Sequence, residues 1–155
     1  MKPSTQPFTV PTKLKGDLAL VLSYWERLRR REAQMPFWDD VNLSALPALS
    51  ARLVMIEASD KPVRFRFSFG LVGAEVRAQY GGDLAGKFPD EIEIRHPLQF
   101  VISQCSATVE SAQPTYYERA AGGRGSPAQP GYSRLILPLW GDGRVGMLLG
   151  AFAWA

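Results

Sequence analysis

The stretch from residue 63 to residue 71 constrains the fold more than any other part of the chain, because its side chains alternate without interruption. Apolar residues occupy one set of positions and polar or small residues the other: Val63, Phe65, Phe67, Phe69 and Leu71 against Arg64, Arg66, Ser68 and Gly70. This period of two predicts a β-strand with one buried and one wet face. At Gly73 the period changes, and residues 74–80 predict a short helix that ends at Gly81 and Gly82.

Size and composition are typical of one globular domain. The chain has 155 residues, of which 46% are hydrophobic and 21% charged, enough for a substantial core. The net charge is only +3, and the arginines are scattered apart from those in residues 27–31. Nucleic-acid binding is therefore not expected, because such proteins concentrate their positive charge more strongly. The single cysteine, Cys105, excludes an internal disulfide and a cysteine-based metal cluster.

Residues 1–16 predict a flexible N-terminal arm. They hold three prolines and few apolar side chains. A signal peptide would carry an apolar core at this position. No segment of the chain approaches the roughly 18–20 apolar residues that span a membrane. We therefore expect a cytoplasmic protein without membrane contact.

A leading helix is predicted over residues 17–32, with Asp17 as its cap. Its apolar residues are spaced three and four apart and form one stripe: Leu18, Val21, Leu22, Trp25 and Leu28. Arginines at its end suit the negative end of the helix dipole. The simplest interpretation of residues 29–31 is a solvated helix end, and contact with an acidic partner or nucleic acid is the alternative.

The remaining pattern predicts an antiparallel sheet. Its expected elements are a strand over 52–57, the strand from Val63, the short helix 74–80, a helix from Pro97 to about Gln113, and strands over 115–119, 132–140 and 145–154. Glycine, proline and small polar residues over 121–131 predict a mobile hairpin loop. Pro138 indicates a sheet edge or a bulge. The helices between the second and third strands are expected to cover one face of the sheet.

Three motifs in this order resemble a family of small standalone bacterial PAS domains. Residues 22–31 (LSYWERLRRR), followed by Pro36, are similar to the Tyr-Trp-x-x-Leu-Arg helix of that family. Residues 71–74 (LVGA) and 82–86 (GDLAG) resemble its Leu-Val-Gly-Thr and Gly-x-Asp-Leu-Thr-Gly segments. Residues 132–139 and 143–151 resemble its closing hairpin. Ala74 and Ala85 stand where the family usually has threonine, so neither position is claimed as a polar contact.

The resemblance implies an α+β, PAS-like fold as a single domain over residues 17–155. The expected sheet has five antiparallel strands in the order 2-1-5-4-3, with helices on one face and the N-terminal helix in addition. It also implies a non-enzymatic sensory or signalling module that binds a small molecule, a partner protein, or both. We expect no effector domain after the last strand, and therefore expect output through a partner protein and a homodimer formed through the leading helix.

The candidate ligand pocket lies between the long helix and the inner face of the sheet. Its expected lining residues are Phe100, Gln104, Tyr117, Arg134 and Met147. The alternative is a fully packed core without a ligand, because large aromatic side chains can fill a small domain completely. The identity of any ligand or cofactor is unknown from the sequence.

Metal and cofactor chemistry has few candidate residues. His96 is the only histidine, which excludes a two-histidine metal site. Cys105 lies nine residues away, about 13 Å along a helix, too far for a catalytic Cys–His pair. Its apolar surroundings predict a core residue. The Asn-Cys-Arg context of a flavin-adduct photosensor is absent, and His96 as an axial haem ligand is the weaker alternative to a surface histidine. Neither haem nor flavin is expected.

Two rival functions stay open. A small isomerase or dehydratase on an α+β cone would need a tyrosine paired with an acid or histidine, and the available set is Tyr116 or Tyr117 with Glu118 or His96. Raised pKa values of carboxyl groups in an apolar pocket would accompany that function. Nucleic-acid binding through residues 27–31 would instead predict an affinity that falls steeply with salt.

Overall fold

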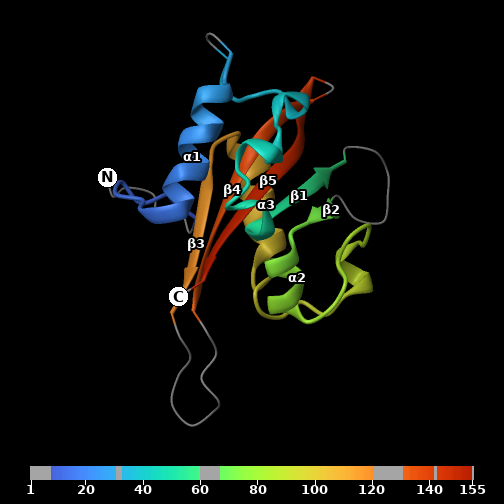
Figure 1. The fold of residues 1–155 in the computed structure, drawn as a ribbon. Coiled ribbons are helices and arrows are strands. Elements are labelled where there is room, and N and C mark those ends of the chain that lie inside the picture. The colour runs from blue at the N-terminus through green and yellow to red at the C-terminus, as the bar shows by residue number, and fades with distance from the viewer. Residues whose placement is uncertain (1–7, 31–32, 60–66, 121–130, 142, 155) are drawn as a thin grey trace, which may run out of the picture.

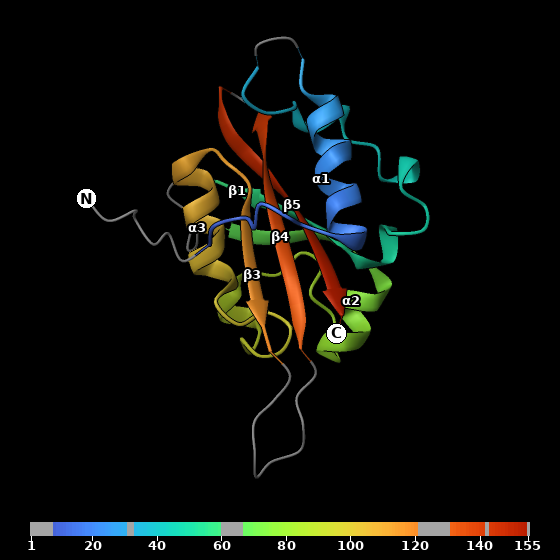
Figure 2. The ribbon, with the colours of Figure 1, turned by 90° about the vertical axis from the view of Figure 1, so that its left-hand side faces the viewer.

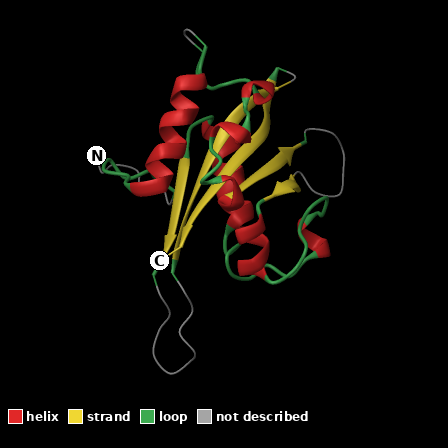
Figure 3. Cartoon of the chain, viewed as in Figure 1, coloured by secondary structure: helices red, strands yellow, loops and turns green. Residues whose placement is uncertain are grey.

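The sheet has the predicted strand order. The computed structural model describes residues 8–30, 33–59, 67–120, 131–141 and 143–154. Five antiparallel strands lie in the order β2-β1-β5-β4-β3 in an α+β fold (Figure 1, Figure 3). The elements are α1 (Gly16–Leu28), β1 (Leu53–Ala58), β2 (Phe67–Val72), α2 (Ala74–Tyr80), α3 (Val101–Ser111), β3 (Thr115–Arg119), β4 (Tyr132–Gly141) and β5 (Arg144–Trp154). The predicted strand residues 63–66 and nearly all of the predicted loop 121–131 lie outside the described residues.

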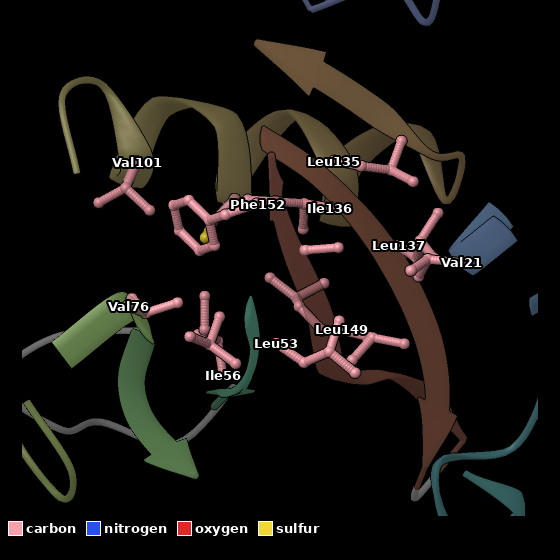
Figure 4. Packing of buried hydrophobic residues seen from close by; sticks show 14 of the residues in the cluster. Val21, Leu53, Ile56, Val76, Val101, Leu135, Ile136, Leu137, Leu149 and Phe152 are labelled. Atoms are coloured by element: carbon pink, nitrogen blue, oxygen red, sulfur yellow. The ribbon is translucent and has the colours of Figure 1, made fainter. Parts of the chain in front are cut away.

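Helices cover both faces of the sheet. In Figure 4, Val101 of α3 and Val76 of α2 lie on the side of Phe152, whereas Val21 of α1 lies beside Leu137 on the other side. The pairing of β4 with β5 agrees with this assignment of faces. Arg134 pairs with Phe152 and shares its face, and Leu137 lies on the opposite face because side chains alternate along the strand. We call these the α3 face and the α1 face. The helices α2 and α3 share one face, as predicted, and α1 packs separately.

Helix α1 buries its apolar stripe against its own sheet. Leu18, Val21 and Trp25 are buried, facing leucines of β4 and β5 that are fully buried. Burying a leucine or valine side chain contributes about 1.5–3 kcal/mol. A homodimer through α1 would therefore have to use its outer side, where Leu20 is exposed.

The ends of two helices differ from the sequence prediction. Helix α1 ends at Leu28, not at residue 32, and Asp17 forms an ion pair with Arg52 instead of capping the helix. Helix α3 begins at Val101, not at Pro97. Phe100 has a left-handed backbone with φ of 60°, which is incompatible with a helix interior, so the segment before it forms turns.

A bulge between β1 and β2 turns Leu71 away from the buried face on which the alternating pattern of the sequence placed it. Val54 pairs with Val72, but Ile56 pairs with Phe69, so β2 holds one extra residue between these pairs. A one-residue insertion reverses the direction of each following side chain. Leu71 is consequently 55% exposed, although the sequence pattern predicted it to be buried.

Pro138 lies at a local edge next to a bulge, as predicted. Strand β3 pairs with β4 only as far as Ile136, and the β4–β5 register shifts just after Leu139. Beyond β3, the indole Nε1 of Trp25 donates to the carbonyl oxygen of Pro138 at 2.8 Å. Because the missing N–H of Pro138 faces this edge, which β3 does not reach, the proline breaks no ladder hydrogen bond with β5.

Candidate functional site

Arg134 is the centre of a buried polar cluster on the α3 face. Its side chain is 1% exposed. The Nε atom donates to Oε1 of Gln104 at 2.7 Å, Nη1 to the carbonyl oxygen of Pro97 at 3.0 Å, and Nη2 to that of Gln99 at 2.8 Å. The guanidinium carbon lies 4.8 Å from the ring centroid of Tyr117. Burial lowers the pKa of Arg134, because the charged form is poorly solvated there.

Gln104 connects this cluster to two threonines. It is fully buried, and its Nε2 donates to Oγ1 of Thr115 at 3.1 Å and to the carbonyl oxygen of Arg134 at 3.2 Å. Thr108 donates to the carbonyl oxygen of Gln104 at 2.8 Å, and its Oγ1 lies 2.6 Å from that of Thr115. The network therefore ties α3 to β3 and β4. No sequence pattern indicated that either threonine belongs to the cluster.

The structure brings four of the five predicted pocket residues together: Phe100, Gln104, Tyr117 and Arg134. The ring of Phe100 lies 5.9 Å from that of Tyr117. Met147 is not part of this cluster. It pairs with Leu139 and lies on the α1 face, because alternation along β5 turns Leu148 toward the α3 face instead.

Among the residues that the structure describes, side chains fill the space between α3 and the sheet. The cavity found there has a volume of about 10 Å³ and is lined by Ile56, Phe67, Ser68, Phe69, Pro89, Val101, Ile102 and Cys105. A buried water needs a volume of about 10–15 Å³, so this space holds at most one water. The described residues therefore leave no room for a small-molecule ligand at that position, which favours the packed-core alternative there.

The positive charge of Arg134 has no carboxylate partner among the described residues. Two titratable neighbours, Tyr132 and Cys105, are neutral near pH 7, because burial raises the pKa of Tyr132 and raises that of Cys105 to about 12. Carbonyl oxygens, the amide of Gln104 and the aromatic rings therefore stabilise the guanidinium. A buried charge held in this way depends strongly on each acceptor.

Cys105 is expected to be inert toward thiol reagents in the folded protein. It is 1% exposed, and its raised pKa leaves almost no reactive thiolate at pH 7. We expect Ellman's reagent to release its chromophore only after denaturant unfolds the chain. The absorbance is recorded with and without urea. Stoichiometric reaction of the native chain within the mixing time would contradict this burial.

His96 packs beside the cluster. Its Nε2 lies 2.9 Å from Oε1 of Gln79 on α2, and its ring meets that of Tyr132 edge-on at 5.2 Å between centroids. Its Nδ1 is buried and has no hydrogen-bond partner among the described residues. Burial is the main cause that lowers the pKa of His96, and the positive charge of Arg119 adds to it. Protonation therefore disfavours this packing.

The free energy of unfolding is expected to decrease as the pH is lowered, because His96 becomes protonated. The pKa of His96 in the folded chain lies below the usual value of about 6.5. Between these two pKa values, the unfolded chain therefore binds more protons at His96 than the folded chain does. The contribution of His96 is fully present above pH ~6.5 and is lost below it. Denaturant titrations between about pH 7.5 and 5.5 should show a flatter profile for His96→Phe than for the unmodified chain. Equal slopes would contradict the assignment.

The residues of the enzyme alternative do not converge. The hydroxyl oxygen of Tyr116 lies 3.1 Å from Oε1 of Glu118 and 3.1 Å from Oγ of Ser133. Tyr117 points to the opposite face of β3, where His96 also packs. The sheet therefore separates the Tyr116–Glu118 pair from the other two candidates. In the described part of the chain, no three His, Cys, Asp or Glu residues are grouped to hold a metal ion.

The arginines that follow α1 make local contacts. Both Nε and Nη2 of Arg30 donate to the carboxylate of Asp40 at 3.0 Å, and its guanidinium carbon lies 4.5 Å from the ring centroid of Phe37. The guanidinium of Arg29 lies over the ring of Trp25. The hydrogen bond from Arg30 lowers the pKa of Asp40. The ion pair with Asp40 neutralises part of the positive charge that nucleic-acid binding through residues 27–31 would require.

The chain matches no protein-family model, and no curated protein matches it. None of the helices in the described ranges has the length and apolar character needed to cross a membrane. The function is therefore inferred from the geometry of the chain itself.

Proposed function

We propose that the chain is a PAS-like, non-enzymatic signalling domain that relays a signal by contact with a partner protein. The observation that supports this most is the filled space between α3 and the sheet, with its cavity of about 10 Å³. A packed interior leaves the surface as the place where the domain acts. The strand order β2-β1-β5-β4-β3, with α2 and α3 between β2 and β3, is the order that the PAS-like resemblance implies.

Polar contacts connect the two helix layers, which a relay requires. Arg52 forms an ion pair with Asp17 of α1, and its Nε lies 3.7 Å from Oε1 of Glu75 on α2. The same Glu75 oxygen accepts a hydrogen bond from Nε1 of Trp154 at 2.9 Å. A partner that shifts α1 would therefore also disturb α2 and the end of β5. Displacement of one packed element is a common way to transmit a signal.

The composition of the purified protein tests this proposal. Native mass spectrometry before and after denaturation, together with a visible spectrum, measures any co-purifying molecule. We expect a colourless protein whose native mass is a whole multiple of the chain mass. A bound small molecule of stoichiometric amount would contradict the packed interior and would direct attention to Arg134 and its neighbours.

Binding of a small anion is the second candidate, because Arg134 is buried without a carboxylate. Phe100 covers this region from outside with 61% of its surface exposed and packs on Tyr117. An anion that displaced Phe100 would find an unneutralised guanidinium. Anion binding is measured as the increase in melting temperature in succinate or benzoate relative to chloride at equal ionic strength. Stabilisation that Arg134→Met abolishes would favour an anion sensor, and equal melting curves would reject it.

A further inference from the structure

Residues 8–14, which belong to the N-terminal arm predicted over residues 1–16, lie against the sheet. From here on, 'the arm' means residues 8–14 only. The carbonyl oxygen of Phe8 accepts a hydrogen bond from the backbone N–H of Tyr116 at 2.9 Å. The Phe8 ring lies 6.5 Å from that of Tyr117, and Val10 and Leu14 pack against the core. In Figure 2 this segment crosses β4 and β3 on the side of α1. The arm therefore covers part of the α1 face and reaches the outer edge of β3.

The arm occupies a surface that is suited to an extended segment. Strand β3 is the last strand of the sheet, and the outward N–H of Tyr116 is satisfied by the arm. Unpaired strand edges accept extended segments of other chains through the same backbone hydrogen bonds. The alternate side chains Phe8 and Val10 are half-buried, whereas Thr9 between them is exposed. The contact thus combines backbone pairing with apolar packing.

A groove of about 620 Å³ lies beside the arm. Phe8, Thr9 and Val10 form one of its walls. Side chains of α1, the connector after it, and the α3–β3 corner form the rest, among them Leu22, Trp25 and Pro114. Because the arm is one wall, its departure would open the groove and the β3 edge together.

The arm joins α1 at a residue that can act as a hinge. Gly16 has φ of +67°, a backbone conformation that disfavours residues with a side chain. No atom lies within 4 Å of the position where its Cβ would be, so the packing does not hold this residue in place. Lys15 before it is exposed. A change of backbone angles at Gly16 could redirect the arm without disturbing α1.

We propose that two copies of the chain exchange arms, so that residues 8–14 of each copy occupy the β3 edge and the groove wall of the other. The arm of a second copy is the occupant whose fit to this surface is already evident, since it would repeat the contacts of Phe8 and Val10. Exchange of an identical segment keeps those contacts and changes only the hinge, which makes it a low-cost route to a dimer. This inference does not depend on the proposed signalling function.

Variants of the full chain at Gly16 test the hinge. Alanine is strained at φ of +67°, whereas asparagine tolerates this region better. Gly16→Ala should therefore weaken the closed arm and raise the dimer association constant about 5–10-fold over Gly16→Asn. Sedimentation equilibrium measures this constant. Native mass spectrometry of mixed ¹⁵N-labelled and unlabelled chains should reveal dimers that contain one of each.

Variants within the arm test which surface forms the dimer. Val10→Asp places a charge in the packed contact, whereas Thr12→Asp changes an exposed position of the same arm. We expect Val10→Asp to abolish the dimer and Thr12→Asp to retain it, with circular dichroism showing that both variants are folded. A chain that stays monomeric up to its solubility limit would overturn the proposal. A dimer that survives Val10→Asp would also overturn it, because the interface would then lie elsewhere.

Discussion

Replacing Gly73 with alanine is expected to destabilise the fold by about 3 kcal/mol, at the upper end of the cost of overpacking. The added Cβ would lie 2.4 Å from the carbonyl oxygen of Ala51 and 2.7 Å from that of Ser50. Both atoms belong to the backbone and cannot rotate away. The N–H of Gly73 also donates to the carbonyl oxygen of Leu53 at 2.8 Å, which holds the two segments together. Urea denaturation of Gly73→Ala measures the loss.

Gly82→Ala is the matched control for this prediction. Its added Cβ would lie 3.4 Å from the nearest atom, in the ring of Tyr80, which is an ordinary contact. We expect it to change the free energy of unfolding by less than about 1 kcal/mol. If Gly73→Ala costs no more than Gly82→Ala, the close approach of residues 50–51 does not limit this position.

The strands could be predicted because their patterns are local. Thr115–Arg119 was predicted with the bounds that the structure has, since β-branched and aromatic residues fill it and Pro114 precedes it. The Asp-Gly pair at residues 142–143, between the predicted strands 132–140 and 145–154, favours a tight hairpin turn, and β4 and β5 are antiparallel neighbours. The order of the strands depended on the family resemblance, because local patterns do not determine which strands become neighbours.

The side chains whose predicted face was wrong depend on the register between strands, which the sequence of a single strand does not determine. Leu71 lies beyond a bulge that is defined only by pairing with β1, and the face of Met147 follows from its pairing with β4. Similarly, α1 ends early at Leu28, although its arginine-rich continuation suits a helix. Arg29 and Arg30 contact aromatic rings of Trp25 and Phe37 instead.

Four members of the candidate site were predicted from the sequence, but the hydrogen bonds among them were not. Gln104 and Arg134 were expected to face a pocket, yet they bond to each other at 2.7 Å. Thr108 follows Cys105 by three residues on the same helix, and this spacing gave no signal that its hydroxyl meets that of Thr115 across the core. Such contacts form between segments far apart in the sequence, so composition and spacing within one segment cannot reveal them.

Gln104→Leu is expected to destabilise the fold by about 1.5–3 kcal/mol, because it leaves a buried charge without one of its acceptors. Leucine has a similar volume, so cavity formation contributes little. The change removes the acceptor of Arg134 Nε and the donor to Thr115. Gln113→Leu, at an exposed position, is the control and should cost less than about 0.5 kcal/mol. Chemical denaturation of both variants gives the comparison.

The double variant Gln104→Leu/Arg134→Met separates the role of the charge from that of packing. Removing both partners eliminates the unsatisfied guanidinium, so the double variant should lose less stability than the two single variants added together, by about 0.5–3 kcal/mol. Full recovery is not expected, because the carbonyl oxygens of Pro97 and Gln99 lose their donor. Strict additivity would show that the two side chains do not depend on each other. A stable double variant would also show that folding does not require the charge of Arg134, so that any binding of anions lost with it reports on function.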